Sequence, residues 1–69
     1  MNKLSHLLKQ KRKELGLTQE ELARKAGVGL RFVRECEQGK ETMRIDKVNQ
    51  VLSLFGYHLA PERIEDREL

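Results

Sequence analysis

The stretch GLTQEELARKAGVGLRFVRECEQG, residues 16–39, decides the fold of this chain. Thr18 is followed three residues later by Glu21, which is the spacing of a capping box. In a capping box the hydroxyl accepts a hydrogen bond from the backbone of the glutamate, and the glutamate accepts one from the backbone of the threonine. A helix is therefore predicted over 18–26, ended by Gly27 in the left-handed conformation that glycine allows.

A second short helix is predicted directly after this turn. Gly29 is an acceptable N-cap, and apolar residues then recur at helical spacing until Gly39 closes the segment. The predicted helix covers 30–38, and the residues that carry its period are Leu30, Val33 and Cys36. A free cysteine at such an inner position packs as a small hydrophobic residue, with redox sensing as the alternative.

Apolar residues at helical spacing also flank this stretch on both sides. The upstream helix is predicted over about 3–15, with the apolar positions Leu4, Leu7, Leu8 and Leu15. The downstream helix is predicted from Asp46 as N-cap to Gly56, with the apolar positions Val48, Val51, Leu52 and Phe55. The predicted fold class is therefore all-α, with four helices.

Length and charge limit the chain to one small, basic domain. A chain of 69 residues buries only about 60% of its unfolded surface, which leaves no room for a second core. The net charge is +3, but residues 1–44 carry eleven basic and six acidic side chains, whereas 45–69 carry three basic and five acidic ones. The basic excess therefore coincides with the two central helices.

Composition also disfavours several classes of protein. No long apolar run or signal peptide appears, and a single cysteine is typical of a reducing compartment. We therefore expect a soluble, cytoplasmic protein with no membrane partner. His6 and His58 have no second ligand nearby in sequence, so no metal or other cofactor is expected. Ser5 beside His6 lies on a short helix that cannot form an oxyanion hole, and we expect no catalytic residues and no enzyme.

Over roughly residues 4–56 the chain resembles the Xre/Cro family of phage-repressor-like helix-turn-helix proteins. The resemblance is carried by LTQEELA at 17–23, by the turn at Gly27, and by ECEQGK at 35–40. It implies a four-helix, lambda-repressor-like DNA-binding domain over residues 1–60, in which the two central helices form the helix-turn-helix. It also implies a homodimer that binds a palindromic DNA operator, with two recognition helices in successive major grooves.

Within that family the chain is most similar to HipB-type antitoxin repressors, on the basis of TMRIDKVNQVLSLFGYHL at 42–59. This narrower resemblance implies a repressor that autoregulates its operon and neutralises a HipA-like serine/threonine kinase toxin. Two alternatives stay open. One is a phage-type or restriction-modification controller without a toxin, and the other is a protein-binding helix-turn-helix adaptor that no longer engages DNA.

The first half of the second motif helix supplies the expected contacts with bases, because that half enters the major groove in such proteins. The expected base-reading residues are Gly29, Leu30, Arg31, Arg34 and Glu35. Arg31 can pair with O6 and N7 of guanine, and Arg34 can reach the next base or a phosphate. Leu30 can contact a thymine methyl group, whereas Glu35 can accept from a cytosine amino group or exclude bases that crowd it.

A second set of residues is expected to contact phosphates, which require positive charge or N–H donors rather than a base edge. The set comprises Gln19, Phe32, Gln38, Lys40, Thr42 and Arg44. Gln19 resembles the family glutamine that contacts phosphate and braces the recognition helix. For Phe32 the alternative is core packing against the preceding helix.

Arg12 and Glu37 match family positions that form an internal salt bridge, which fixes the recognition helix more than it adds stability. We therefore expect Glu37 to be structural. The alternative is an exposed Arg12 that contacts phosphate.

After Gly56 the side chains alternate up to Pro61, which predicts a short edge strand at 57–60. Such a strand needs a partner, so we expect it to pair across a dimer whose interface includes Leu54, Tyr57 and Leu59. The alternative is a packed tail on a helix-only dimer or on a monomer. Residues 61–69 are expected to form a flexible charged tail, either a frayed terminus or a docking segment for a toxin.

Overall fold

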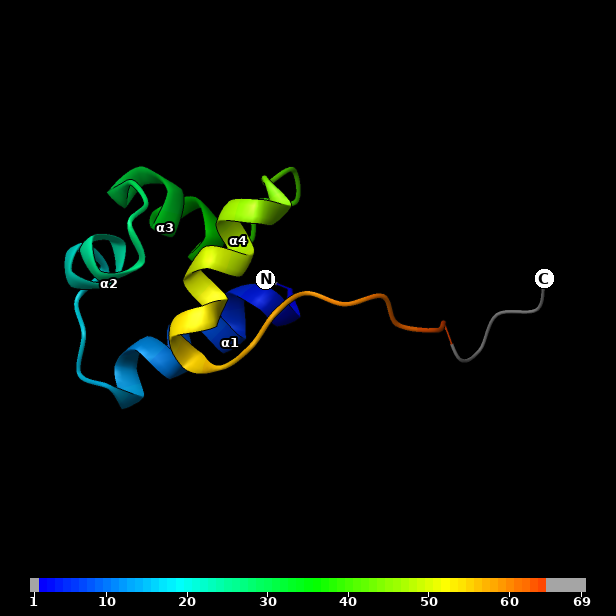
Figure 1. Cartoon of the computed structure of the whole chain (residues 1–69), viewed down its shortest axis with the longest axis horizontal. Helices are drawn as coiled ribbons and strands as arrows, with labels where there is room; N and C mark the ends of the chain where they lie inside the picture. The colour runs from blue at the N-terminus through cyan, green and yellow to red at the C-terminus, as the bar shows by residue number, and fades with distance from the viewer. Residues whose placement is uncertain (1, 65–69) are drawn as a thin grey trace.

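The computed structural model describes residues 2–64, and within them the chain forms four α-helices and one 3-10 turn (Figure 1). The elements in order are α1 (Lys3–Glu14), α2 (Gln19–Ala26), α3 (Leu30–Glu37), α4 (Ile45–Leu52) and η1 (Ser53–Phe55). The four-helix, all-α prediction is confirmed. The bounds of the first three helices differ from the predicted ones by a single residue at one end.

The capping box at the start of α2 is present as predicted. The Glu21 N–H donates to Thr18 Oγ1 at 3.1 Å, and the Thr18 N–H donates to Glu21 Oε1 at 2.8 Å. At the other end, Gly27 has a φ of 74°, and the Val28 N–H closes the turn on the Ala23 carbonyl at 3.0 Å. Local hydrogen bonds therefore fix both ends of α2.

The turn between α2 and α3 has a further partner that the sequence does not predict. Gln50 of α4 donates from Nε2 to the Ala26 carbonyl at 2.8 Å and to the Gly27 carbonyl at 3.2 Å. A Cβ atom on Gly27 would lie 3.1 Å from the same amide nitrogen. One side chain of α4 thus satisfies carbonyls at the end of α2, where a helix leaves them without internal partners.

Both ends of α4 differ from the predicted ones. Arg44 is the N-cap residue, and Asp46 lies in the first turn rather than before it. The Asp46 carboxylate accepts two hydrogen bonds from Arg44, from Nε at 3.2 Å and from Nη2 at 2.7 Å. A carboxylate in the first turn is also favoured by the helix dipole, which explains why the residue type resembled a cap. α4 ends at Leu52, before the predicted end at Gly56. The intervening residues Ser53–Phe55 form η1.

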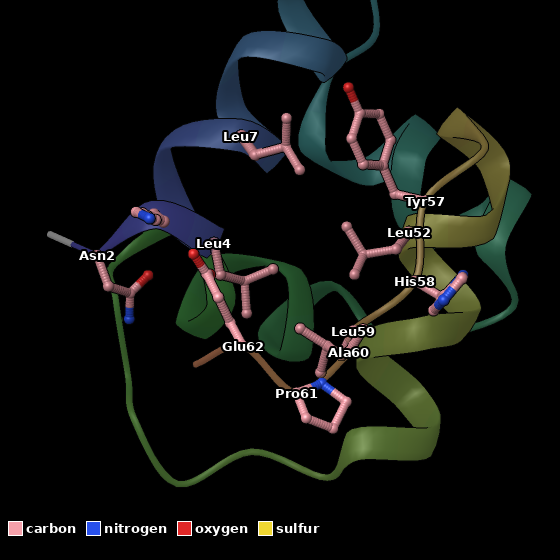
Figure 2. Close-up of a pocket in the computed structure, with 11 residues that line it drawn as sticks. Asn2, Leu4, Leu7, Leu52, Tyr57, His58, Leu59, Ala60, Pro61 and Glu62 are labelled. Carbon is pink, nitrogen blue, oxygen red and sulfur yellow. The ribbon is translucent and has the colours of Figure 1, made fainter. Parts of the chain in front are cut away.

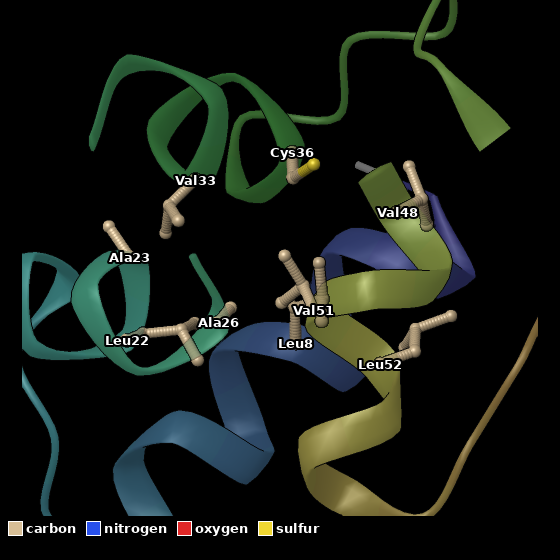
Figure 3. Packing of buried hydrophobic residues seen from close by; sticks show 9 residues of the cluster. All are labelled: Leu8, Leu22, Ala23, Ala26, Val33, Cys36, Val48, Val51 and Leu52. Atoms are coloured by element: carbon tan, nitrogen blue, oxygen red, sulfur yellow. The ribbon is translucent and has the colours of Figure 1, made fainter. Parts of the chain in front are cut away.

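All four helices contribute side chains to a single core (Figure 3). The buried apolar residues are Leu8, Leu22, Ala23, Ala26, Val33, Cys36, Val48, Val51 and Leu52. The Cys36 thiol is free and buried, and burial, with the nearby charges of Glu35 and Glu37, raises its pKa to about 11. The prediction that Cys36 packs as a core residue is confirmed. The inward placement of Leu15 is wrong, because Leu15 follows the last residue of α1 and is exposed.

Residues 57–64 form neither helix nor strand, and the orange trace in Figure 1 leads away from the helices toward its end. Residues 57–60 form no strand in the described chain, and the pairing of this segment across a dimer stays a prediction. Instead the Leu59 N–H donates to Asn49 Oδ1 of α4 at 2.6 Å. The expected tail at 61–69 extends beyond the described residues, because 65–69 lie outside them.

Two further properties of residues 2–64 bear on the function classes. None of their helices has the length and apolar character needed to cross a membrane. Nor do His, Cys, Asp or Glu side chains gather there in groups of three or more suited to a metal ion.

Candidate nucleic-acid interface

The outer face of α3 carries two arginines. The Arg31 side chain is 91% exposed and Arg34 is exposed as well, whereas Val33, Cys36 and Glu37 are buried on the opposite face. An amphipathic helix of this kind turns its apolar side to the core and presents its polar side to solvent. The structure therefore leaves both guanidinium groups available to a ligand outside the domain.

The other expected base-reading residues lie in different surroundings. Gly29 is the exposed N-cap of α3 and has only backbone groups to offer. Leu30 is partly buried against the core, and it lines a shallow hollow together with Thr18, Gln19, Glu20 and Arg34. Glu35 is 27% exposed and pairs with cations on either side of it. Arg31 and Arg34 are thus the long side chains of the set that are fully exposed.

Several of the expected phosphate-contacting residues surround one hollow between α3 and α4. It is lined by Phe32, Glu35, Lys40, Thr42, Met43, Arg44 and Lys47. Phe32 is partly buried and packs against the core, which is the alternative considered for it. Lys47 was missed because a single lysine in a helix is an ordinary surface residue until the fold places it beside Lys40 and Arg44. Gln38 is the exposed C-cap of α3 and does not line this hollow.

Behind α3, Arg12 and Glu37 form a buried ion pair with two hydrogen bonds. Arg12 Nε donates to Glu37 Oε2 at 2.7 Å and Nη2 donates to Oε1 at 3.0 Å, while Gln19 Nε2 donates to Oε1 at 3.1 Å. Arg12 Nη1 also donates to the Leu17 carbonyl at 2.9 Å. The Glu37 carboxylate is therefore bound from α1 and from α2, which fixes the end of α3 relative to both helices. Gln19 here braces α3 through Glu37.

The electrostatics of Glu37 follow from these contacts. Burial by itself would raise the pKa of Glu37, because it disfavours the charged form. The hydrogen bonds from Arg12 and Gln19, with the positive charges of Arg12 and Lys9, outweigh burial and leave the pKa of Glu37 below its usual value of 4.5. The carboxylate is consequently ionised at neutral pH.

This lowered pKa predicts acid sensitivity. A group whose pKa is lower in the folded state stabilises that state above its unfolded pKa, and the contribution disappears as the pH falls through the folded value. We expect the contribution of Glu37 to begin to fall at about pH 4.5 and to be lost below its lowered pKa. Urea unfolding of the wild type and Glu37→Gln at pH values between about 5 and 3 should show the smaller pH dependence in the variant. Equal slopes would contradict the assignment.

The residues expected at a dimer interface lie on two separate hollows. Leu54, Tyr57 and Leu59 are all exposed. Tyr57 and Leu59 line a groove of about 670 Å³ against Leu4 and Leu7 of α1 (Figure 2). Leu54 lies instead in a hollow with Leu15, Leu17, Lys25 and Phe55. The three residues expected at one interface therefore line two different hollows.

Comparison with known proteins supports the architecture. Residues 8–61 match the family model HTH_3, described as helix-turn-helix, which is more than half of the chain. The chain is also 58% identical over 45 residues to a protein of Sinorhizobium fredii (strain NBRC 101917 / NGR234) named "Uncharacterized HTH-type transcriptional regulator y4mF". That match covers 65% of the chain but 59% of the relative, so the chain spans about three fifths of the relative's length. With a matching fold and motif, this chain belongs to the HTH_3 family of helix-turn-helix proteins.

Proposed function

We propose that this protein is a sequence-specific DNA-binding transcriptional regulator that represses by covering its operator. The observation that carries the proposal is the outward presentation of Arg31 and Arg34 on α3, while the opposite face of α3 is fixed by the core and by Glu37. A recognition helix needs both properties, because base contacts require a definite tilt and depth in the major groove.

The proposed contacts divide into base reading and phosphate binding. Arg31 pairs with a guanine, Arg34 reaches the neighbouring base or a phosphate, and the remaining candidates for base contacts at this edge are Gly29 and Leu30. Phosphates are bound around the α3–α4 hollow by Lys40, Thr42, Arg44 and Lys47, and at the start of α2 by Gln19. Support comes from the shared position of three cations, Lys40, Arg44 and Lys47, on one hollow.

We propose that the protein binds DNA as a homodimer. Two recognition helices about 34 Å apart would then enter successive major grooves of a palindromic operator. The support is the exposure of the apolar side chains Leu54, Tyr57 and Leu59, which a second copy would cover. Sedimentation of the purified protein should give a dimer, and Tyr57→Lys should shift it toward monomer. A wild-type monomer at micromolar concentration would contradict this part.

Base reading by Arg31 predicts a specific binding defect. We expect Arg31→Ala to weaken operator binding by about 1–3 kcal/mol and to relax selectivity at one base position. Lys47→Ala, a phosphate contact, should weaken all sequences alike and reduce the log-log salt slope by about 1. The operator is first selected from a random library by the wild-type protein, and both variants are then titrated by fluorescence anisotropy at several salt concentrations. A wild type without salt-dependent binding would favour the adaptor alternative.

The antitoxin role is a finer proposal that depends on the resemblance of residues 42–59 to HipB-type repressors. We propose that a HipA-like kinase encoded by the neighbouring gene binds this protein, and that the complex binds the operator more tightly through avidity. Co-expression with the neighbouring gene should yield a complex that copurifies. A neighbouring gene unrelated to kinases would leave a regulator without a toxin, of the phage or restriction-modification controller type.

A further inference from the structure

Glu35 places a negative charge in the middle of the cations that the proposed function requires. Its Oε2 atom lies 3.1 Å from Lys40 Nζ and 3.8 Å from Arg31 Nε. Both cations therefore approach the same carboxylate oxygen, one from the α3–α4 loop and the other from the preceding turn of α3. The Arg31 and Lys40 side chains are 91% and 48% exposed, so solvent or DNA can reach both.

We propose that Glu35 is an intramolecular competitor of DNA phosphates and thereby a determinant of specificity. In the free protein its carboxylate partly neutralises Arg31 and Lys40, which weakens binding to DNA of arbitrary sequence more than binding to the operator. This inference rests on the proposed DNA-binding function. It assigns Glu35 a role through two neighbouring side chains, in place of a direct contact with a base.

The physical reason is that phosphate contacts dominate binding to arbitrary DNA, whereas base contacts add to them on the operator. Binding to arbitrary sequence depends almost entirely on phosphates and their counterions, so it loses whatever charge Glu35 neutralises. On the operator, a guanine offers Arg31 two acceptors at once, and the looser 3.8 Å contact with Glu35 competes poorly with that pairing. The loss of affinity caused by the Glu35 charge is thus offset on the operator by the contact between Arg31 and guanine. On all other sequences the loss remains.

The surroundings of Glu35 support this role. Of the residues that line the α3–α4 hollow, three are cations and one, Glu35, is a carboxylate. Arg44, one of those cations, is already held by two hydrogen bonds from its side chain to Asp46. A phosphate that pairs with Lys40 must therefore compete with Glu35, and any phosphate in the hollow meets the repulsion of this carboxylate.

The test compares Glu35→Gln with Glu41→Gln, which changes the net charge equally. Glu41 is exposed in the same loop and, within the described chain, makes no ion pair or side-chain hydrogen bond. The probes are a random-sequence duplex and the duplex selected by the wild-type protein. We expect Glu35→Gln to bind the random duplex about five- to tenfold more tightly, with a smaller gain on the selected duplex and a lower specificity ratio. Its salt slope on random DNA should steepen by about 0.9 for each cation released to a phosphate.

A double-mutant cycle tests whether the effect passes through Lys40. In a Lys40→Ala background, the gain from Glu35→Gln on random DNA should shrink, because only Arg31 remains to be released. Glu35→Ala serves as a second variant with the same expected direction, and circular dichroism verifies that each variant is folded.

Three outcomes would overturn the proposal. Equal effects of Glu35→Gln and Glu41→Gln on random DNA would show that only net charge matters. A loss of binding confined to the selected duplex would show that Glu35 reads a base. Both of these results leave the proposed DNA-binding function intact. A wild type that binds neither duplex in a salt-dependent way would instead overturn the proposed function, and this inference with it.

Discussion

Glu37→Gln is expected to lower the free energy of unfolding by about 3 kcal/mol, the lower end of the range for removing one partner of a buried ion pair. The Glu37 side chain is 2% exposed and accepts hydrogen bonds on both oxygens. A glutamine amide would turn an N–H₂ group toward the donors of Arg12 or Gln19, and the Arg12 charge would lose its counter-ion. The expected loss lies at the lower end because the Arg12 side chain is 14% exposed, so water can hydrate part of its unpaired charge.

Urea unfolding followed by circular dichroism at pH 7 measures this effect. Glu41→Gln is the matched control, since it removes the same charge from an exposed position and should leave the midpoint nearly unchanged. Folded proteins have only about 0.05–0.15 kcal/mol of stability per residue, so for a chain of 69 residues the expected loss is a large fraction of the total. Unchanged unfolding and unchanged operator binding together would contradict a structural role for Glu37.

A double variant separates the effect of the ion pair on the stability of the fold from its effect on the orientation of α3. Replacement of both partners by methionine, Arg12→Met with Glu37→Met, should recover much of the lost stability, because no buried charge remains unpaired. The carboxylate that connects α1 and α2 to the end of α3 would still be missing. We therefore expect a folded double variant with weaker operator binding. Full binding by that variant would show that the ion pair does not position α3.

Leu22→Ala is expected to cost about 2–5 kcal/mol, the range for truncating a buried leucine. Leu22 is 0% exposed and belongs to the core to which all four helices contribute (Figure 3). Truncation removes apolar contacts and leaves a cavity that the surrounding helices fill only in part. Because a chain of 69 residues has a small core, this single cavity should unfold a substantial fraction of the protein at 37 °C.

Thermal unfolding and urea titration both report this loss. Leu54→Ala is the control, because Leu54 is an exposed leucine of η1 and its truncation should change stability by less than about 1 kcal/mol. Operator binding by Leu22→Ala should fall in proportion to the folded fraction and recover at lower temperature. Wild-type stability in Leu22→Ala would mean that the helices collapse around the truncated side chain.

The helices could be predicted from the sequence because their signals are local. The Thr18–Glu21 capping box and the turn at Gly27 depend on residues at most five positions apart, and the structure forms both. Two errors show the limit of such signals. Asp46 has the residue type of an N-cap but lies inside the first turn, and Leu15 keeps the apolar period but falls after the last residue of α1. Sequence spacing locates a helix more reliably than it locates its ends.

The candidate site also has one part that the sequence predicts and another that it does not. The outward position of Arg31 and Arg34 follows from the period of α3, because Val33 and Cys36 must face the core. By contrast, no local rule brings Gln50 to the turn between α2 and α3, or Lys47 to the hollow beside Lys40. Those contacts exist only because α4 packs across the other helices.

By itself the sequence determined four helices, a capped turn between the central two, and the face of α3 that meets solvent. Backbone geometry and residue chemistry within one or two helical turns suffice for each of these. Only the tertiary structure decided that Glu37 is bound from α1 and α2, that Glu35 lies between Arg31 and Lys40, and that residues 57–60 form no strand in the single chain. These features depend on how the helices pack, and packing joins groups far apart in sequence, such as Arg12 and Glu37, which are separated by 25 positions.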